Sequence, residues 1–246
     1  MSGVNALLLL IGGFFAGVIN SMAGGGSLLS VPLLELGGVL GTTANGTNRI
    51  AVLAQNATGA YGFARRNVGN RKRTIQVLIP AALGALIGAS VASQIPDELF
   101  RRLFGLLMLP LLFLSIRKPK IEQTETPWPL WLSSAIFLVV GVYGGAVQAG
   151  VGLIILLVLT RAGFDLVTAN AMKTVVILAI TVIAVPIFIY NDQVRWLPAL
   201  VLSLGMGIGG YVGANVAVDG GERVIRPVMV VVVLVLATKM LGLWGD

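Results

Sequence analysis

Long apolar stretches are the feature that most restricts how this chain can fold. Residues 4–22, 74–94 and 99–116 are predominantly apolar, and a helix needs about 20 such residues to cross a bilayer. Only 11% of the chain is charged, against about 25% in a typical soluble domain. Lipid offers no hydrogen bonds to the backbone, so such stretches form helices. The alternating pattern of a membrane β-barrel is absent. We therefore predict an all-α, polytopic membrane helix bundle.

A glycine-rich segment, residues 20–27 (NSMAGGGS), interrupts the first apolar region. Each glycine inside a helix costs about 1 kcal/mol relative to alanine, so three in succession favour a break. Irregular backbone at membrane depth persists only where it is buried in protein or lines a wet cavity. The following apolar segment, 28–40, is too short to span a bilayer at the rise of an α-helix. We predict that residues 4–40 form a helical hairpin or a broken helix, with the glycines forming half of a substrate site.

The chain contains neither cysteine nor histidine. This excludes disulfides, thiol nucleophiles, histidine-ligated metals and Ser-His-Asp catalysis. We therefore predict no cofactor, no metal site and no enzymatic activity.

The net charge of +7 lies mostly in short loops, with five cations in residues 65–73. The positive-inside rule explains this loop as cytoplasmic, with anionic-lipid or partner binding as a minor alternative. The expected partners are the lipid bilayer and a small anionic substrate, and nucleic acid is not among them.

The second half of the sequence repeats the first at a shift of 125 residues. The triplet Thr-Ala-Asn at 43–45 recurs at 168–170. The same shift superimposes several glycines and places Arg101 on Arg226. Such matches predict a duplicated membrane unit. We expect a first repeat over residues 1–117, a linker over 118–127 and a second repeat over 128–246.

The two repeats are expected to be inverted relative to each other. The basic loop 65–73 corresponds to 190–198, which has a single arginine and aromatic residues at both ends. Cation-poor loops and interfacial aromatics are typical of the outer face, so the two loops are predicted to lie on opposite sides. That requires an odd number of crossings, such as a broken-helix hairpin plus three spanning helices in each repeat. If the hairpin is instead one broken span, four crossings give a parallel pair.

Polar residues at equivalent places in the two halves are the candidate site. Helix N-termini at a glycine break can bind anions. Glycines spaced along a helix instead favour close helix packing. These spaced glycines are Gly84, Gly88, Gly205, Gly207, Gly209, Gly210 and Gly213. The Thr-Ala-Asn segments fit helix N-caps. Arg49 and Lys173 are charges inside apolar sequence, which indicates function by default, although snorkelling to the interface is an alternative. Glu35 is the candidate for carrying a coupling proton.

The predicted substrate-binding residues lie in the two glycine breaks and in the polar segments that follow them. They are Asn20, Ser21, Gly24, Gly25, Gly26, Ser27, Asn45, Asn48, Arg49, Gln148, Gly150, Asn170 and Lys173.

The residues 17–27, Pro32 and 43–48 resemble the first-repeat signature of the sulfite exporter TauE/SafE family. The resemblance covers essentially the whole chain, but the second glycine break reads AGVG at 149–152 instead of three consecutive glycines. It implies a multi-pass transporter of the bacterial inner membrane that exports small sulfur-containing anions, such as sulfite or organosulfonates, by alternating access. An anion channel or a non-transporting membrane assembly subunit are the alternatives. The sequence leaves the oligomeric state open, a homo-oligomer included.

Overall fold

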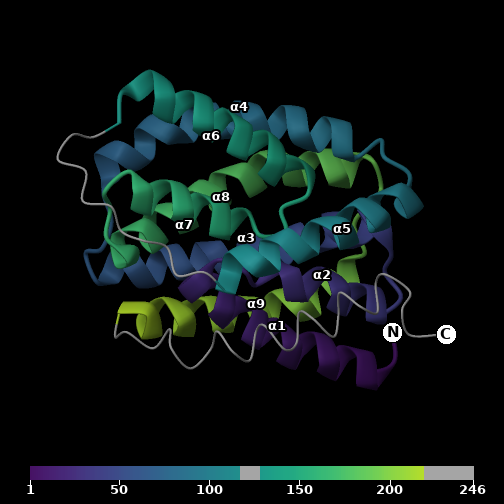
Figure 1. Cartoon of the computed structure of the whole chain (residues 1–246). Helices are drawn as coiled ribbons and strands as arrows, with labels where there is room; N and C mark the ends of the chain where they lie inside the picture. The colour runs from purple at the N-terminus through teal and green to yellow at the C-terminus, as the bar shows by residue number, and fades with distance from the viewer. Residues whose placement is uncertain (117–127, 219–246) are drawn as a thin grey trace.

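The computed structural model describes residues 1–116 and 128–218, which form nine α-helices and no strands (Figure 1). The helices are α1 (Gly3–Ala23), α2 (Ser27–Leu36), α3 (Gly41–Arg65), α4 (Arg71–Ala92), α5 (Asp97–Ile116), α6 (Leu130–Ala146), α7 (Val151–Arg161), α8 (Leu166–Tyr190) and α9 (Trp196–Val218). The expected linker at 118–127 and Arg226 lie outside the described residues. The all-helical prediction is confirmed for the described part of the chain.

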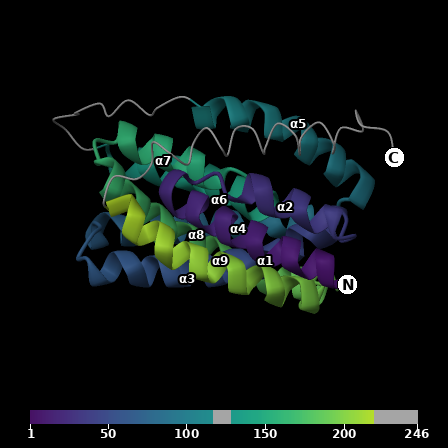
Figure 2. The ribbon, with the colours of Figure 1, turned by 90° about the horizontal axis from the view of Figure 1, so that it is seen from below.

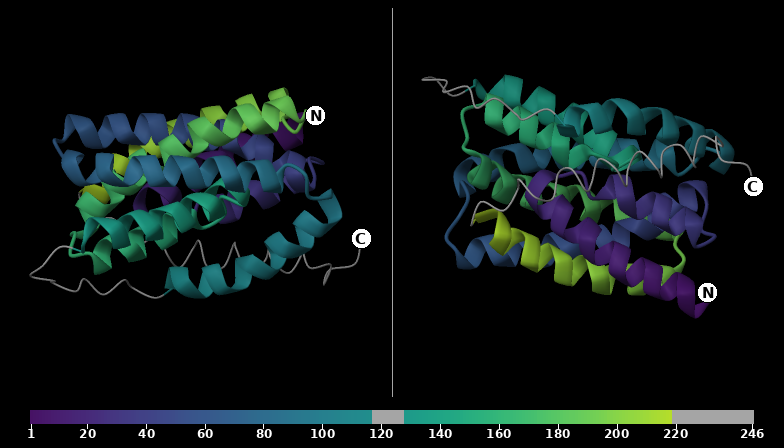
Figure 3. Two further views of the ribbon diagram at one scale, coloured as in Figure 1. Left: turned by 90° about the horizontal axis from the view of Figure 1, so that it is seen from above. Right: turned by 60° about the horizontal axis from the view of Figure 1, so that its bottom comes forward.

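Four of these helices are long and apolar enough to cross a membrane. They are α1, α4, α8 and α9, while α2, α6 and α7 are apolar but shorter. Helix α3 has the same length as α8, 25 residues each, but carries many buried polar residues. Most helices run along one common long axis (Figure 3).

Exposed and buried residues are distributed as in a membrane protein. Large apolar side chains lie on the outside, with Ile79 69% and Val139 68% exposed. Polar side chains such as Asn45, Asn48 and Gln55 are fully buried. An apolar exterior is stable against lipid but not against water, so the exterior matches a bilayer environment.

The glycine-rich segment 20–27 turns the chain back on itself. A Cβ on Gly12 would lie 2.6 Å from the Leu33 side chain, and one on Gly26 would lie 2.5 Å from the Cβ of Asn20. Helix α2 therefore runs back along α1, so residues 4–40 form a hairpin. Helices α6 and α7 form a second hairpin. Helix α2 lies toward the end of the bundle that holds the N-terminus, and α7 lies toward the other end (Figures 1 and 2).

Spaced glycines allow the long helices to pack closely. Helix α1 packs along α9 (Figure 2), and α4 packs along α6. A Cβ on Gly213 would lie 2.7 Å from the carbonyl oxygen of Val18, and equivalent carbonyl contacts exist at Gly84, Gly88, Gly205, Gly209 and Gly210. The predicted packing role is confirmed for these six glycines. Gly207 is different, because the nearest atom to its Cβ would be 3.9 Å away.

Helices α3 and α8 cross at the centre of the bundle in opposite directions. Gly46 near the start of α3 adjoins Phe188 near the end of α8, whereas Gly59 adjoins Thr174. The loop after α8 therefore lies at the start of α3, where the Arg195 N–H donates to the Thr47 hydroxyl at 3.0 Å. The basic loop after α3 adjoins the start of α8. The two loops lie at opposite ends of the bundle.

Candidate functional site

The break between α1 and α2 leaves the last carbonyl groups of α1 near the centre of the bundle. Helix α1 ends with Gly24 in a left-handed conformation, φ 80°, which glycine adopts without a steric penalty. The carbonyl groups of this last turn accept hydrogen bonds from α8. The Lys173 Nζ donates to the Asn20 oxygen at 2.7 Å and to the Ser21 oxygen at 3.3 Å. The amide of Asn170 donates to the Met22 oxygen at 3.0 Å.

The break between α6 and α7 has an equivalent arrangement with residues of α3. The guanidinium of Arg49 donates to the oxygen of Gly144 at 3.1 Å, to that of Gly145, and to that of Ala146 at 3.2 Å. The Asn45 amide also donates to the Ala146 oxygen, at 2.8 Å. The ring of Phe188 lies 4.5 Å from the guanidinium carbon, a cation–π distance.

Each central cation therefore occupies the C-terminal end of a broken helix from the other half of the chain. Helix C-termini carry partial negative charge, which stabilises cations. The side chains of Arg49 and Lys173 are both fully buried, so neither snorkels to the membrane surface. No carboxylate pairs with Arg49 among the residues that the structure describes. Its charge is balanced there by carbonyl dipoles and by the ring of Phe188.

The two breaks touch each other. A Cβ on Gly152 would lie 2.6 Å from the Gly24 oxygen, so only glycines permit this approach. The Ser27 hydroxyl joins the breaks, because it donates to the Gln148 oxygen at 3.3 Å and accepts from the Gly150 N–H at 3.1 Å. The Gly24 N–H donates to the Asn20 oxygen at 3.0 Å. The N–H groups of Gly24 and Gly150, which we expected to bind the anion, are therefore engaged within the protein.

A second group of buried amides lies beside the first break. The Asn20 amide donates to Gln55 Oε1 at 2.5 Å, and Gln55 Nε2 donates to the Ser21 hydroxyl at 2.9 Å. That hydroxyl donates to the Gly210 oxygen at 3.0 Å, which connects α1, α3 and α9. Asn20 and Ser21 are thus held by contacts from three other helices, α3, α8 and α9.

Gln55 and Thr181 also belong to these buried networks, although the sequence analysis did not assign them to the site. Gln55 was visible only as a polar residue in an apolar run. Thr181 accepts from Gln148 Nε2 at 3.0 Å and lies 125 residues after Asn56. The shift that defines the repeat would therefore have identified Thr181 as the counterpart of a buried amide.

The Thr-Ala-Asn segments do not cap helices, so that prediction was wrong. Helix α3 has Leu40 at its N-cap, with no side-chain hydrogen bond. Helix α8 is capped by Asp165, whose carboxylate accepts from the N–H groups of Val167 and Thr168 at 3.0 Å each. Asn45 and Asn170 lie inside the first turns of their helices and bind carbonyls of the opposite break.

Several buried polar atoms at the second break and on the adjoining part of α3 have no hydrogen-bond partner within the described residues. They are both amide atoms of Asn48, Oδ1 of Asn45, Nε of Arg49 and Oε1 of Gln148. Asn48 is fully buried. Folded proteins satisfy the great majority of buried polar groups, so a cluster of exceptions requires an explanation. A ligand that binds between the breaks would provide one.

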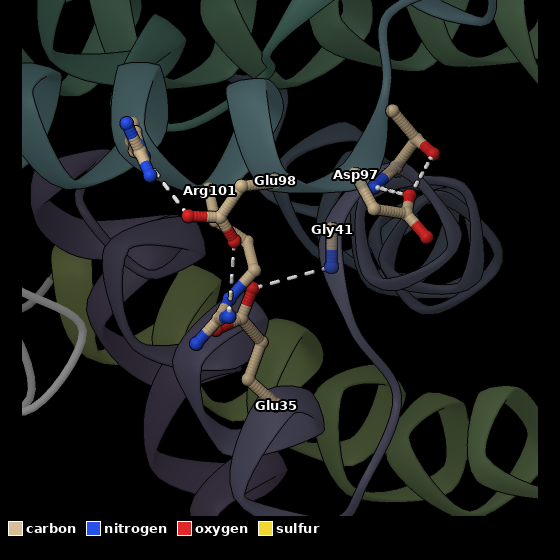
Figure 4. A network of polar contacts seen from close by, with 7 residues as sticks. Glu35, Gly41, Asp97, Glu98 and Arg101 are labelled. Carbon is tan, nitrogen blue, oxygen red and sulfur yellow. Dashed lines mark hydrogen bonds and ion pairs between the residues drawn. The ribbon is translucent and has the colours of Figure 1, made fainter. Parts of the chain in front are cut away.

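Glu35 lies in a separate polar network (Figure 4). Its helix α2 lies toward the end of the bundle that holds the N-terminus (Figures 1 and 2). Its Oε2 pairs with Arg101 Nε at 3.4 Å, and its Oε1 accepts from the Gly41 N–H at 3.3 Å. Asp97 accepts from the Thr42 N–H at 2.9 Å in the same region. The network joins α2, α3 and α5. The structure brings the predicted substrate-binding residues together at the breaks, but pairs Glu35 with a cation elsewhere.

All predicted substrate-binding residues are buried. A pocket between α4, α6, α7 and α8 opens at the end that holds the basic loop, with Arg73 and Gln76 in its lining. None of the predicted substrate-binding residues lines this pocket.

Comparison with known proteins places this chain in a family. Residues 9–240 match the model of the family described as "Sulfite exporter TauE/SafE". The chain belongs to this family. A probable membrane transporter protein of Sinorhizobium sp is 27% identical over 95% of this chain and 91% of its own length. A probable membrane transporter protein of Haemophilus influenzae is 27% identical over 97% of this chain and 95% of its own length. The Escherichia coli K12 relative YfcA, a probable membrane transporter protein, is 26% identical over 95% of this chain and 90% of its own length.

No solved structure matches the chain. The family and the relatives together identify this TauE/SafE member as a membrane transporter.

Proposed function

We propose that this TauE/SafE member is a secondary transporter that exports small sulfur-containing anions, such as sulfite or organosulfonates, across the bacterial inner membrane. The description of the family as a sulfite exporter supports the substrate class and the direction. The substrate would bind where the two helix breaks meet. Transport would proceed by alternating access, with the two hairpins opening the site to one side at a time.

The buried charge of Arg49 is the observation that carries this proposal. A charge within a membrane protein is costly, and it marks a functional site by default. Arg49 is fully buried, and no carboxylate pairs with it in the described part of the chain. An anion at the breaks would supply the missing negative charge. It would compete with the carbonyls of Gly144 and Gly145 for the guanidinium, so substrate binding and release of the hairpin would be coupled.

The proposed site includes residues from both breaks and from the helices that cross beside them. Arg49 and Lys173 would provide charge, and the amides of Asn48, Asn170 and Gln148 would provide hydrogen bonds. The N–H groups of Gly25 and Gly26 would contribute from the first break. The remaining predicted residues would hold the two breaks together.

An inverted pair of repeats would give the alternating-access mechanism. Three features support it. Adding 125 to the bounds of α3, Gly41–Arg65, gives the bounds of α8, Leu166–Tyr190. The packing of α1 on α9 corresponds to that of α6 on α4. The loops after α3 and α8 lie at opposite ends of the bundle.

The test is the flux of labelled sulfite and of a labelled organosulfonate in proteoliposomes that contain the wild type or Arg49→Gln. Arg102→Gln is the matched control, because the Arg102 side chain is 76% exposed and pairs with Glu98 outside the breaks. We expect Arg49→Gln to reduce saturable flux at least about tenfold, since charged hydrogen bonds contribute about 1.5–3 kcal/mol. Arg102→Gln should transport normally.

Normal flux in a well-folded Arg49→Gln variant would reject the assignment of the anion to this cation. Saturation and counter-transport of unlabelled substrate distinguish a transporter from a channel. Flux that increases linearly with concentration and lacks counter-transport would favour the channel.

A further inference from the structure

We infer that the transported anion carries a hydrogen-bond donor of its own, a hydroxyl or an N–H group close to the anionic group. This inference rests on the proposed function and narrows its substrates to organosulfonates that carry a hydroxyl or amino group, because the sulfite dianion has acceptor oxygens only. It follows from the kinds of atoms that lack partners at the second break. Three are acceptor oxygens, on Asn45, Asn48 and Gln148, and two are donors, Asn48 Nδ2 and Arg49 Nε.

The residues that carry these atoms lie on neighbouring positions of α3 and at the second break. Asn45 and Arg49 lie one turn apart on α3 and both donate to the Ala146 oxygen. Asn48 lies three residues after Asn45, a spacing that places two side chains on neighbouring parts of one helix face. Gln148 follows Ala146 by two residues, and its backbone oxygen accepts from Ser27.

The hydrogen bonds of the neighbouring atoms identify which amide atoms are oxygens. The Asn45 atom that contacts the Ala146 oxygen must be a nitrogen, so the unpartnered atom is the carbonyl oxygen. Gln148 contacts the hydroxyl of Thr181. That hydroxyl already donates to the Ile177 oxygen at 2.7 Å, so it can only accept from Gln148. The unpartnered atom of Gln148 is therefore also an oxygen.

An anion with acceptor atoms alone would satisfy only part of this site. Its oxygens could bind Arg49 Nε and Asn48 Nδ2, but the three amide oxygens would remain unpaired beside a negative charge. A hydroxyl or N–H group on the ligand would donate to one or more of them. A site that hydrogen-bonds a substrate hydroxyl discriminates strongly against an analogue that lacks it, because its own polar groups are then left unpaired.

The experiment compares two anions of equal heavy-atom number, 2-hydroxyethanesulfonate and propane-1-sulfonate, which exchange a hydroxyl for a methyl group. Each unlabelled anion competes with labelled 2-hydroxyethanesulfonate, and the flux of the label is measured in proteoliposomes that contain the wild type, Asn48→Leu or Asn48→Ala. We expect the wild type to prefer the hydroxylated anion at least about tenfold, because the methyl analogue leaves a buried acceptor unpaired. Both variants lose the Asn48 oxygen and should reduce that preference at least about threefold. Asn48→Ala replaces Asn48→Leu if the larger side chain prevents folding.

The outcomes separate this inference from the proposed function. Equal competition by both anions in the wild type would overturn the requirement for a donor and leave the anion transporter in place. A preference that persists unchanged in both variants would overturn the role of Asn48 in selecting the donor. Absence of flux and of competition for any anion in the wild type would reject the proposed function, and this inference with it.

Discussion

Replacement of Asn48 by alanine should leave the fold at least as stable as the wild type while weakening transport. Asn48 is fully buried, and neither of its amide atoms has a partner among the described residues. An amide that makes no hydrogen bond contributes no hydrogen-bond energy that its removal could lose. A substrate that binds this amide would lose its contact.

The magnitude follows from three effects. Removing an unpartnered buried amide recovers about 1–3 kcal/mol of desolvation. Alanine has a higher helix propensity than asparagine, by about 0.6 kcal/mol. The deleted atoms leave a cavity of roughly 50 Å³, which costs about 1.2 kcal/mol at about 24 cal/mol per Å³. The net effect is a stabilisation of about 0.4–2.4 kcal/mol. Loss of the hydrogen bond to the substrate should separately raise the apparent KM about tenfold.

Thermal unfolding of the detergent-solubilised protein, followed by tryptophan fluorescence, measures the first effect, and proteoliposome flux measures the second. Asn45→Ala is the matched control, because Asn45 donates to the Ala146 oxygen at 2.8 Å. That variant should lose about 1–2 kcal/mol of stability. If Asn48→Ala is destabilised as much as Asn45→Ala and transports normally, the amide is bonded within the protein and our reasoning is wrong.

Three further predictions concern packing, capping and topology. Gly152→Ala would place a Cβ 2.6 Å from a backbone oxygen, so it should lower both the unfolding temperature and the flux, whereas Gly207→Ala, with its nearest atom at 3.9 Å, should do neither. Asp165→Ala should destabilise the protein by about 0.5–2 kcal/mol through loss of the α8 cap. Partial burial raises the pKa of the Asp165 carboxyl, but hydrogen bonds from the first residues of α8 outweigh this and lower it. Its contribution should therefore be present above the unfolded-state pKa and be lost as the pH falls through the folded-state pKa. The difference in unfolding temperature between wild type and Asp165→Ala should therefore shrink as the pH falls. A difference that stays constant over the pH range in which Asp165 titrates would contradict its role as the α8 cap. Compartment-specific reporters fused at Asn70 and at Asp192 should report opposite sides of the membrane, and the same side for both would exclude inverted repeats.

Glu35 illustrates a residue whose environment the sequence did not define. It was a candidate for proton coupling because it is an acid in an apolar region. In the structure it pairs with Arg101 of α5, 66 residues away, and binds the Gly41 N–H (Figure 4). That pairing belongs to the network at one end of the bundle, so Glu35 has no described contact with the helix breaks. Its role in proton coupling remains a prediction.

The sequence by itself determined the class of fold and the positions of the helix breaks. Both follow from local properties, because apolar length dictates helices in lipid and consecutive glycines interrupt them. The packing glycines were also predictable, since their spacing on one helix face is a local pattern. The sequence further singled out Arg49 and Lys173, which are charges that an apolar segment does not tolerate without a reason.

Only the tertiary structure decided what those charges contact. Arg49 reaches carbonyls 95 and more residues away, and Lys173 reaches a carbonyl 153 residues away. The sequence predicted only that both cations serve the site, whereas packing places each one on the C-terminal carbonyls of the opposite break. The contact between Gly24 and Gly152 likewise depends on how the two hairpins meet. No local pattern encodes such pairings, because they arise when helices distant in sequence bury their polar faces against one another.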